Sequence, residues 1–315
     1  MDAPPPPATT PEALAGFREA GRIAREAREL AVSMVRPGVR LEEVMVAVED
    51  FIRGQGAGLA FPAQTSVNHV AAHYCPRPGD PTAYREGDVV KVDIGVHVDG
   101  WVADNAQTVY LGDDPRLKRL VDASAAGLAA ALRTAGPGVA LREVSAAIQE
   151  AITSYGFRPV TNLTGHGVAR WTVHCKPSVP AVPDPRQHDV LRPGMVVAIE
   201  PFATTGRGPV TEIGRAEVFM LTRPPRKPKG LDPEVMETIL GLHGLPFSRR
   251  DLRRHPTQAV EATLARLMRT GCLMDFPPLC DSDPSVRIAQ TEHTLVVTED
   301  GIEITTGEVP EVAAP

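Results

Sequence analysis

Residues 35–56 read VRPGVRLEEVMVAVEDFIRGQG, and residues 135–156 read AGPGVALREVSAAIQEAITSYG. At an offset of 100 positions the two segments share Pro-Gly-Val, then Leu, Glu-Val, Ala, Ile and the final Gly. A turn followed by an amphipathic helix can recur by chance, but the shared order of so many residues favours a duplicated unit. The chain is therefore expected to fold as two related halves.

Further elements extend this repeat. Helical patterns cover residues 11–35, 41–56 and 117–134. The segment YREGDVVKVDIG (84–95) resembles VLRPGMVVAIEPF (190–202), and both read as strands that follow a helix pair. We therefore predict an α/β (α+β) fold with an antiparallel sheet core and pseudo-twofold symmetry between the halves.

The composition excludes several classes of protein. The 315 residues are 43% hydrophobic and 23% charged, which is typical of a globular protein. A net charge of −6 argues against a protein that coats nucleic acid or an anionic membrane. There is no apolar run long enough for a membrane span, and the N-terminal MDAPPPPATTPE lacks the basic and apolar regions of a signal peptide. We expect a cytoplasmic protein without a membrane or specific nucleic-acid partner.

The character of the chain changes after Thr222, where the basic, proline-rich stretch 223–230 begins. Helix-forming residues dominate 232–271, and a second proline-rich stretch follows at 276–284. Such stretches are typical of the boundaries of an inserted unit. The expected division is a flexible proline-rich tail, a main domain in two parts and an inserted helical subdomain: residues 1–10, residues 11–222 with 286–315, and residues 223–285.

Two aspartates lie on a predicted hairpin, KVDIGVHVDGWVAD (91–104). If Asp99-Gly100 forms a two-residue turn, Asp93 lies opposite Ala106 and Gly95 opposite Asp104, so both carboxylates share one face of the sheet. They could be an exposed pair on a solvated face, but the apolar residues around them predict buried strands. Buried carboxylates repel each other, and a bound cation removes that repulsion.

Four further side chains are candidates for the same chemistry. Glu200 ends the apolar stretch MVVAIE, and Glu292 lies within the predicted strand 290–298. A carboxylate in such a place is paired, protonated or bound to metal. His166 lies between glycines in NLTGHGV, and His73 follows small residues in VAAHY. A single histidine of this kind is more often structural, but together the four strengthen the prediction of a metal site.

These motifs resemble those of the methionine aminopeptidases. The resemblance rests on FPAQTSVNHVAAHY, KVDIGVHVDGWVAD, NLTGHGV, AIEPFAT and EHTLVVTEDGIEITT, which occur in the family's order between about residues 11 and 306. That family has the duplicated pita-bread fold, and the insert between the Glu200 and Glu292 strands resembles the hallmark of its type 2 members. The implied activity is hydrolytic removal of the initiator methionine from nascent polypeptides.

The resemblance implies two divalent metal ions, Co, Mn, Fe or Zn, which suit a set of four carboxylates and one imidazole. Such a pair of ions supplies a bridging hydroxide near neutral pH. Asp104 and Glu292 would bridge the ions, Asp93 would bind one, and His166 with Glu200 the other. The implied metal ligands are Asp93, Asp104, His166, Glu200 and Glu292.

The resemblance also implies catalytic and substrate-binding residues. His73 would contact the scissile amide and His174 the substrate carbonyl, while Glu200 would accept the water's proton. Phe61 would line the pocket for the methionine side chain, because a thioether suits a partly aromatic wall. The implied enzyme is a monomer that acts on nascent chain ends.

Several residues depart from the family's pattern or have two alternative roles. His69 is either an extra imidazole near the entrance or a surface residue, and Cys175 follows His174 where small residues are common. By strand parity, His97 could support the metal ligands and His293 should face away. The basic loop is either solvated or a ribosome contact: Arg223, Arg226, Lys227 and Lys229.

Two other readings remain. One is a proline-directed peptidase of the same fold, although those enzymes usually carry a large additional N-terminal domain. The other is a non-catalytic binding relative of the proliferation-associated type, although such proteins have lost metal ligands and all five are present here.

Overall fold

The computed structural model describes residues 7–225 and 229–312. Most of the predicted tail, together with Arg226 and Lys227 of the basic loop, lies outside these residues. Within the described part, the N–H of Ala8 donates to the Gly194 carbonyl over 2.9 Å. None of the helices in this part combines the length and apolar character needed to cross a membrane.

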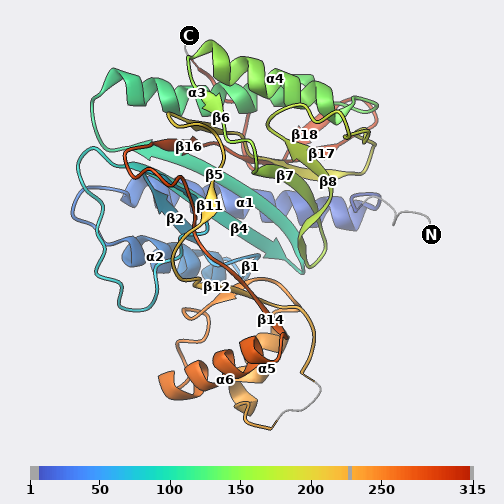
Figure 1. Cartoon of the computed structure of the whole chain (residues 1–315). Helices are drawn as coiled ribbons and strands as arrows, with labels where there is room; N and C mark the ends of the chain where they lie inside the picture. The colour runs from blue at the N-terminus through green and yellow to red at the C-terminus, as the bar shows by residue number, and fades with distance from the viewer. Residues whose placement is uncertain (1–6, 226–228, 313–315) are drawn as a thin grey trace.

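Four long helices flank the central sheets, and two shorter ones lie in the insert (Figure 1). The helices are α1 Pro11–Met34, α2 Leu41–Gly54, α3 Pro115–Thr134, α4 Leu141–Ser154, α5 Pro233–Gly241 and α6 Thr257–Arg269. The strands of the first half are β1 Gly58–Leu59, β2 Gln64–Val67, β3 Val70–Ala72, β4 Val89–Val98 and β5 Trp101–Tyr110. Those that follow are β6 Arg158–Pro159, β7 Thr164–Ala169, β8 Thr172–Pro180, β9 Val196–Ile199, β10 Phe202–Thr204, β11 Thr211–Glu212, β12 Val218–Leu221, β13 Phe247–Ser248, β14 Leu273–Phe276, β15 Leu279–Cys280, β16 Ile288–Gln290, β17 His293–Val297 and β18 Ile302–Ile304.

The two helix pairs confirm the predicted duplication. In α2 and α4, leucine begins the helix and a glycine with positive φ precedes it in the turn, Gly38 at 88° and Gly138 at 83°. Glycine adopts this left-handed conformation without a Cβ clash. The predicted apolar face of α2 is buried, and so is the equivalent face of α4: Leu41, Val44, Val48 and Ile52, and Leu141, Val144, Ile148 and Ile152.

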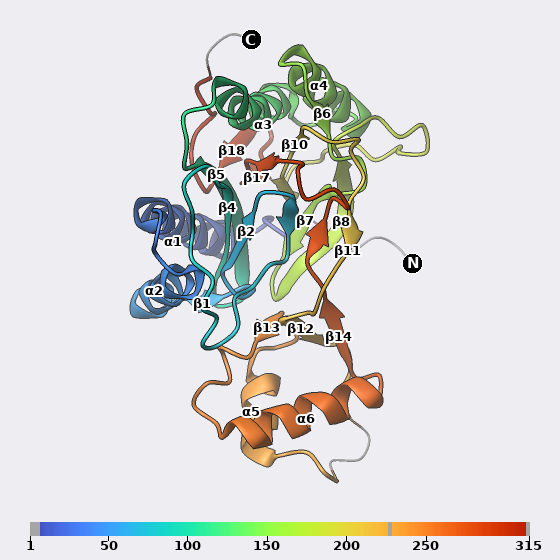
Figure 2. The ribbon, with the colours of Figure 1, turned by 60° about the vertical axis from the view of Figure 1, so that its left-hand side comes forward.

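Each helix pair packs on its own part of the antiparallel sheet structure. Helices α1 and α2 share a core with β4, whereas α3 and α4 share one with β9 and β17. The first sheet has the order β1-β4-β2 with β5 against β4, and the second has the order β18-β17-β9-β7-β8. Helices α1 and α2 lie outside the first sheet, and α3 and α4 lie outside the second (Figure 2).

The two halves are joined through β5. The backbones of Ala106 and Glu292 form an antiparallel bridge, and the Thr294 hydroxyl accepts from the Asp104 N–H over 2.9 Å. The same hydroxyl donates to the Asp104 carbonyl over 2.7 Å. These contacts hold the strand that carries Asp104 beside the strand that follows Glu292.

Two predictions about elements are corrected. The expected single strand over residues 290–298 is divided into β16 and β17, because β16 pairs with β10 and β17 with β9, and Glu292 between them pairs only through its isolated bridge. The insert is not purely helical either. Its helices α5 and α6 pack on a small antiparallel sheet of order β13-β12-β14, which buries Phe219 and Phe247 against them.

The insert is attached to the first half by a buried ion pair. The guanidinium of Arg250 donates to Glu49 Oε1 over 2.6 Å, and the Arg250 side chain is 1% exposed. The same guanidinium donates to the Ala63 carbonyl over 2.7 Å and also contacts Cys75 and Pro76. Removal of either partner would leave an uncompensated buried charge, so a substitution of Arg250 or Glu49 should strongly destabilise the attachment of the insert.

Candidate metal centre and substrate pocket

All eight residues that the sequence singles out as metal ligands, catalytic groups or substrate contacts line one cavity of about 260 Å³. They come from separate segments that the duplicated fold brings together. They are Phe61, His73, Asp93, Asp104, His166, His174, Glu200 and Glu292. The structure thus gathers the predicted set in one place.

The hairpin of β4 and β5 has the register that the turn predicts. Asp93 pairs with Ala106, and Gly95 pairs with Asp104, so the two aspartates project from the same face. The turn needs backbone freedom, and Asp99 and Gly100 both have positive φ, at 49° and 87°. The first half therefore supplies two carboxylates from one continuous hairpin.

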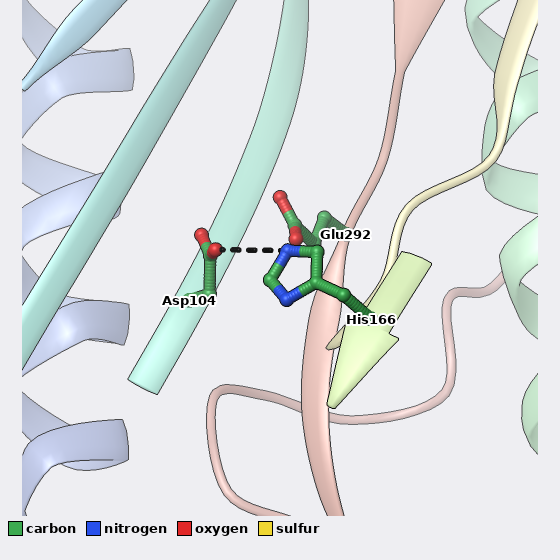
Figure 3. A group of neighbouring side chains, drawn as sticks. All are labelled: Asp104, His166 and Glu292. Carbon is green, nitrogen blue, oxygen red and sulfur yellow. Dashed lines mark ion pairs between the residues drawn. The ribbon is translucent and has the colours of Figure 1, made fainter. Parts of the chain in front are cut away.

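The second half supplies the other acidic groups and the imidazole. Glu200 directly follows β9, His166 lies on β7, and Glu292 lies between β16 and β17. His166 Nε2 is 3.6 Å from Asp104 Oδ2 and 3.6 Å from Glu200 Oε1. In Figure 3 the carboxylates of Asp104 and Glu292 lie beside the His166 ring, and one ligand atom from each of the three lies within 4.8 Å of the others.

The carboxylates share a desolvated site, which makes their ionisation costly. Burial raises the pKa of Asp93 to about 7. Burial first, and then the charges of Asp93 and Glu200, raise the pKa of Asp104 well above its usual range. Burial and neighbouring carboxylates raise the pKa of Glu200 and of Glu292 in the same direction. A cation among these groups would favour their charged forms.

The imidazole is held in the form that binds metal. Burial first, and then the neighbouring His174, lower the pKa of His166 to about 3. His166 is therefore neutral at physiological pH, which leaves a ring nitrogen free to act as a ligand.

The residues fit a divalent ion by a second criterion. Asp93 Oδ1 and Asp104 Oδ1 are buried and have no hydrogen-bond partner among the described residues. A buried carboxylate oxygen without a donor is destabilising, and a coordinated ion satisfies it. Four carboxylates with one imidazole form a donor set for Mn, Fe, Co or Zn rather than for a thiolate-binding metal.

Gln290 is a site residue that the sequence reasoning missed. Its Nε2 donates to Glu292 Oε2 over 3.3 Å and to Glu200 Oε2 over 3.4 Å. Gln290 thus orients two carboxylates from different segments, as groups around a metal site commonly do. The sequence does contain a signal for this role, because Gln290 lies two residues before Glu292 and so on the same face of an extended chain.

The two other histidines of the predicted set, His73 and His174, line the same cavity. The ring of His174 is 4.1 Å from that of His166, and the ring of His73 is 5.9 Å from that of Phe276 in an edge-on arrangement. His73 has a positive φ of 66°, a conformation that costs a non-glycine residue energy and is concentrated at functional sites. Burial lowers the pKa of His73 to about 4, so it is neutral.

An apolar wall completes the cavity. Phe61 packs directly on Gly95, where a Cβ would lie 2.2 Å from the ring, so glycine at position 95 is required for this ring position. The insert and its flanks contribute further apolar side chains that the sequence reasoning did not assign. These are Val218, Pro246, Phe276 and Leu279.

The remaining histidines and Cys175 are not found among the described residues that line the cavity. His97 stacks on Trp171 at 4.7 Å, so its suggested support of the metal ligands is wrong. His293 points away from the cavity, as predicted, and its ring bonds to the Thr306 hydroxyl at 2.9 Å. His69 is half-buried outside the cavity.

The sequence pattern of Metallopeptidase family M24 matches residues 15–299. The chain therefore belongs to this metallopeptidase family, and membership implies that it binds a divalent metal ion.

Individual relatives show which members of the metallopeptidase family this chain resembles in sequence and in fold. A methionine aminopeptidase of Archaeoglobus fulgidus is 41% identical over 289 residues, which cover 91% of this chain and 96% of the relative. The crystal structure of a methionine aminopeptidase from Thermotoga maritima matches with a TM-score of 0.70 at 26% identity, covering 96% of this chain and 100% of that chain. A prolidase from Pyrococcus furiosus shares the fold, with a TM-score of 0.61 at 19% identity, and this chain covers 65% of it. This chain is thus similar over nearly its whole length to methionine aminopeptidases.

Proposed function

We propose that this protein is a methionine aminopeptidase that hydrolytically removes the N-terminal methionine from nascent polypeptides. The observation that carries the proposal is the convergence of four carboxylates and a neutral imidazole in one cavity that apolar side chains also line. The donor set suits a divalent ion, and the walls suit a thioether side chain.

We propose two divalent ions for the site, from among Co, Mn, Fe and Zn. Asp104 and Glu292 would be shared between them, Asp93 would hold one, and His166 with Glu200 would hold the other. Bound there, the ions would supply an activated water and an electrophile for the scissile carbonyl.

The chain's own residues would carry the remaining steps. Glu200 would accept the proton of the attacking water and deliver it to the leaving nitrogen, a role that suits a carboxylate ionised beside the bound metal. His174 would donate to the carbonyl oxygen as charge develops there, and His73 would contact the scissile amide. Phe61 would hold the methionine side chain against the apolar wall.

The proposal also covers the localisation, the oligomeric state and the domain organisation of the enzyme. We propose a cytoplasmic monomer that meets its substrates as they are synthesised, in a main domain of residues 11–222 and 286–315 with an inserted subdomain of residues 223–285.

The test is turnover of Met-Ala-Ser and Pro-Ala-Ser by metal-stripped protein, with each metal added back. Metal-dependent release of methionine from the first peptide, absent in Asp104→Ala, is the expected result. Preferred cleavage next to proline would instead favour the proline-directed alternative. Tight metal binding without any turnover would favour a non-catalytic binding protein.

A further inference from the structure

One polar side chain in the cavity has no role in the proposed hydrolysis. Gln64 lines the cavity and is 5% exposed. Its Oε1 is buried and has no hydrogen-bond partner among the described residues. A buried carboxamide oxygen without a donor costs free energy, so its retention in a cavity indicates a donor that arrives with a ligand.

The ladder between β2 and β4 places Gln64 beside Asp93. The two residues are direct partners across the strands, and paired residues project from the same face of a sheet. The next residue, Thr65, projects to the other face and bonds to the Tyr84 hydroxyl at 2.8 Å within the core. Gln64 therefore faces the metal-binding side of β4.

The apolar wall begins on the other side of Asp93. Phe61 packs on Gly95, two residues further along β4 and on the same face. Asp93 thus lies between an aromatic ring, along its own strand, and the Gln64 amide on the neighbouring strand. A ligand placed at Asp93 would meet an apolar surface in one direction and a carbonyl acceptor in the other.

A substrate with an N-terminal methionine has the matching chemistry. Its thioether side chain and its free α-amino group diverge from one carbon atom, and the amino group carries the only N–H donors at the very end of the chain. Gln64 Oε1 lacks a donor among the described residues and lies at this corner of the cavity, beside the Asp93 carboxylate that would hold a metal ion.

We propose that the Gln64 side-chain carbonyl accepts a hydrogen bond from the free α-amino group of the substrate and so helps to select a chain end. This inference rests on the proposed aminopeptidase function and adds a specificity-determining residue to it. An N-blocked or internal residue keeps only one N–H on this nitrogen and carries an acyl group beside it, so it makes this hydrogen bond less well than a free chain end.

The experiment compares two ligands that differ only in the amino group, L-methionine amide and 4-(methylthio)butanamide. Their dissociation constants are measured by calorimetry on the metal-loaded enzyme and on the metal-stripped enzyme. The variant is Gln64→Met, which keeps the length of the side chain and removes both polar atoms. The matched control is Gln149→Met on the exposed surface of α4.

The expected result is a loss confined to the amine. Gln64→Met should bind L-methionine amide about three- to tenfold more weakly, as for one lost hydrogen bond, and bind the des-amino ligand within about twofold of the wild type. KM for Met-Ala-Ser should rise with kcat little changed, because the bond is the same before and during the reaction. Gln149→Met should match the wild type in each measurement.

An equal loss for both ligands would overturn the proposal and make Gln64 part of the cavity wall only. Weaker metal binding by Gln64→Met would also overturn it, because the amide would then act through Asp93. The dissociation constants require no turnover, so the role of Gln64 is decided separately from whether the wild-type enzyme releases methionine.

Discussion

The two hairpins that flank the site differ in regularity. The ladder of β4 and β5 runs without a break from Val89 opposite Tyr110 to Val98 opposite Trp101. The ladder of β7 and β8 shifts register on both sides of Gly167, directly after His166. The two halves nevertheless follow the same repeat, because Asp93 on β4 and Glu200 after β9 occupy equivalent positions in the aligned segments. Strand parity can therefore predict the partners of Asp93 and Asp104, but it cannot predict the direction of His166.

The difference also separates two ways of building a site. The first half contributes a regular strand pair whose period of two places both aspartates on one face. The second half contributes groups at irregular points, with His166 at a bulge and with Glu200 and Glu292 in the short gaps between strands. Bulges of this kind redirect a side chain and are common next to active sites.

The largest effect is expected when one carboxylate of each half is neutralised. Asp104→Asn and Glu200→Gln should each reduce kcat on Met-Ala-Ser by more than about a hundredfold, since changes outside the ligands alone cost tenfold to a hundredfold. Calorimetric titration should separate the halves, because Asp104→Asn should weaken both ions and Glu200→Gln only one.

The control for these variants is Asp113→Asn, an exposed carboxylate in the loop after β5. It should leave kcat and metal stoichiometry unchanged. If Asp104→Asn retained normal binding of two ions, the proposed bridging role of Asp104 would be wrong.

A smaller effect concerns the stability of the metal-stripped protein. Burial raises the pKa of Asp93 to about 7, so the folded state holds a proton that the unfolded chain releases above about pH 4. The free energy of unfolding should therefore fall as pH rises from about 4 to 7, by about 1.4 kcal/mol per pH unit for each such proton. His166 acts in the opposite sense, because its pKa is lowered to about 3 and its contribution is lost as pH falls below about 6.5.

Thermal unfolding of the chelated protein across this range measures both contributions. Bound metal should abolish the decline towards neutral pH, and Asp93→Asn should reduce it without metal. Because His166 acts in the opposite sense below about pH 6.5, the variant decides the point: a pH profile of chelated Asp93→Asn identical to that of the chelated wild type would show that Asp93 is not desolvated as the structure has it.

The smallest expected effect is on the free energy of unfolding, and it compares the helix α2 of the first half with the helix α4 of the second. Ile52 in α2 and Ile152 in α4 are equivalent in the repeat and fully buried. Ile52→Val and Ile152→Val should each destabilise the fold by about 1 kcal/mol, within the usual cost of one buried methylene. Urea unfolding of the two variants measures this, and costs differing by more than about 1 kcal/mol would mean that the two cores are packed unequally.

Sequence reasoning succeeded where local periodicity was strong and the turn chemistry was clear. The boundaries of β5 and the face of α2 follow from apolar spacing and from Asp99-Gly100. It failed at residues 290–298, because an apolar run carries no signal that the chain changes its pairing partner at Glu292, which bridges to Ala106. It also failed for His97, since parity gives a face of the sheet but not how far along the strand the metal lies.

The sequence by itself determined the duplication, the family resemblance and the residue types that can bind metal, because repeats, motifs and turn residues are local patterns. Only the tertiary structure decided that Gln290 connects Glu200 to Glu292, that Gln64 lies beside Asp93 with an unpaired oxygen, and that the insert supplies part of the cavity wall. These contacts join segments far apart in the chain. Their distances depend on strand pairing and helix packing across both halves, which no local pattern specifies.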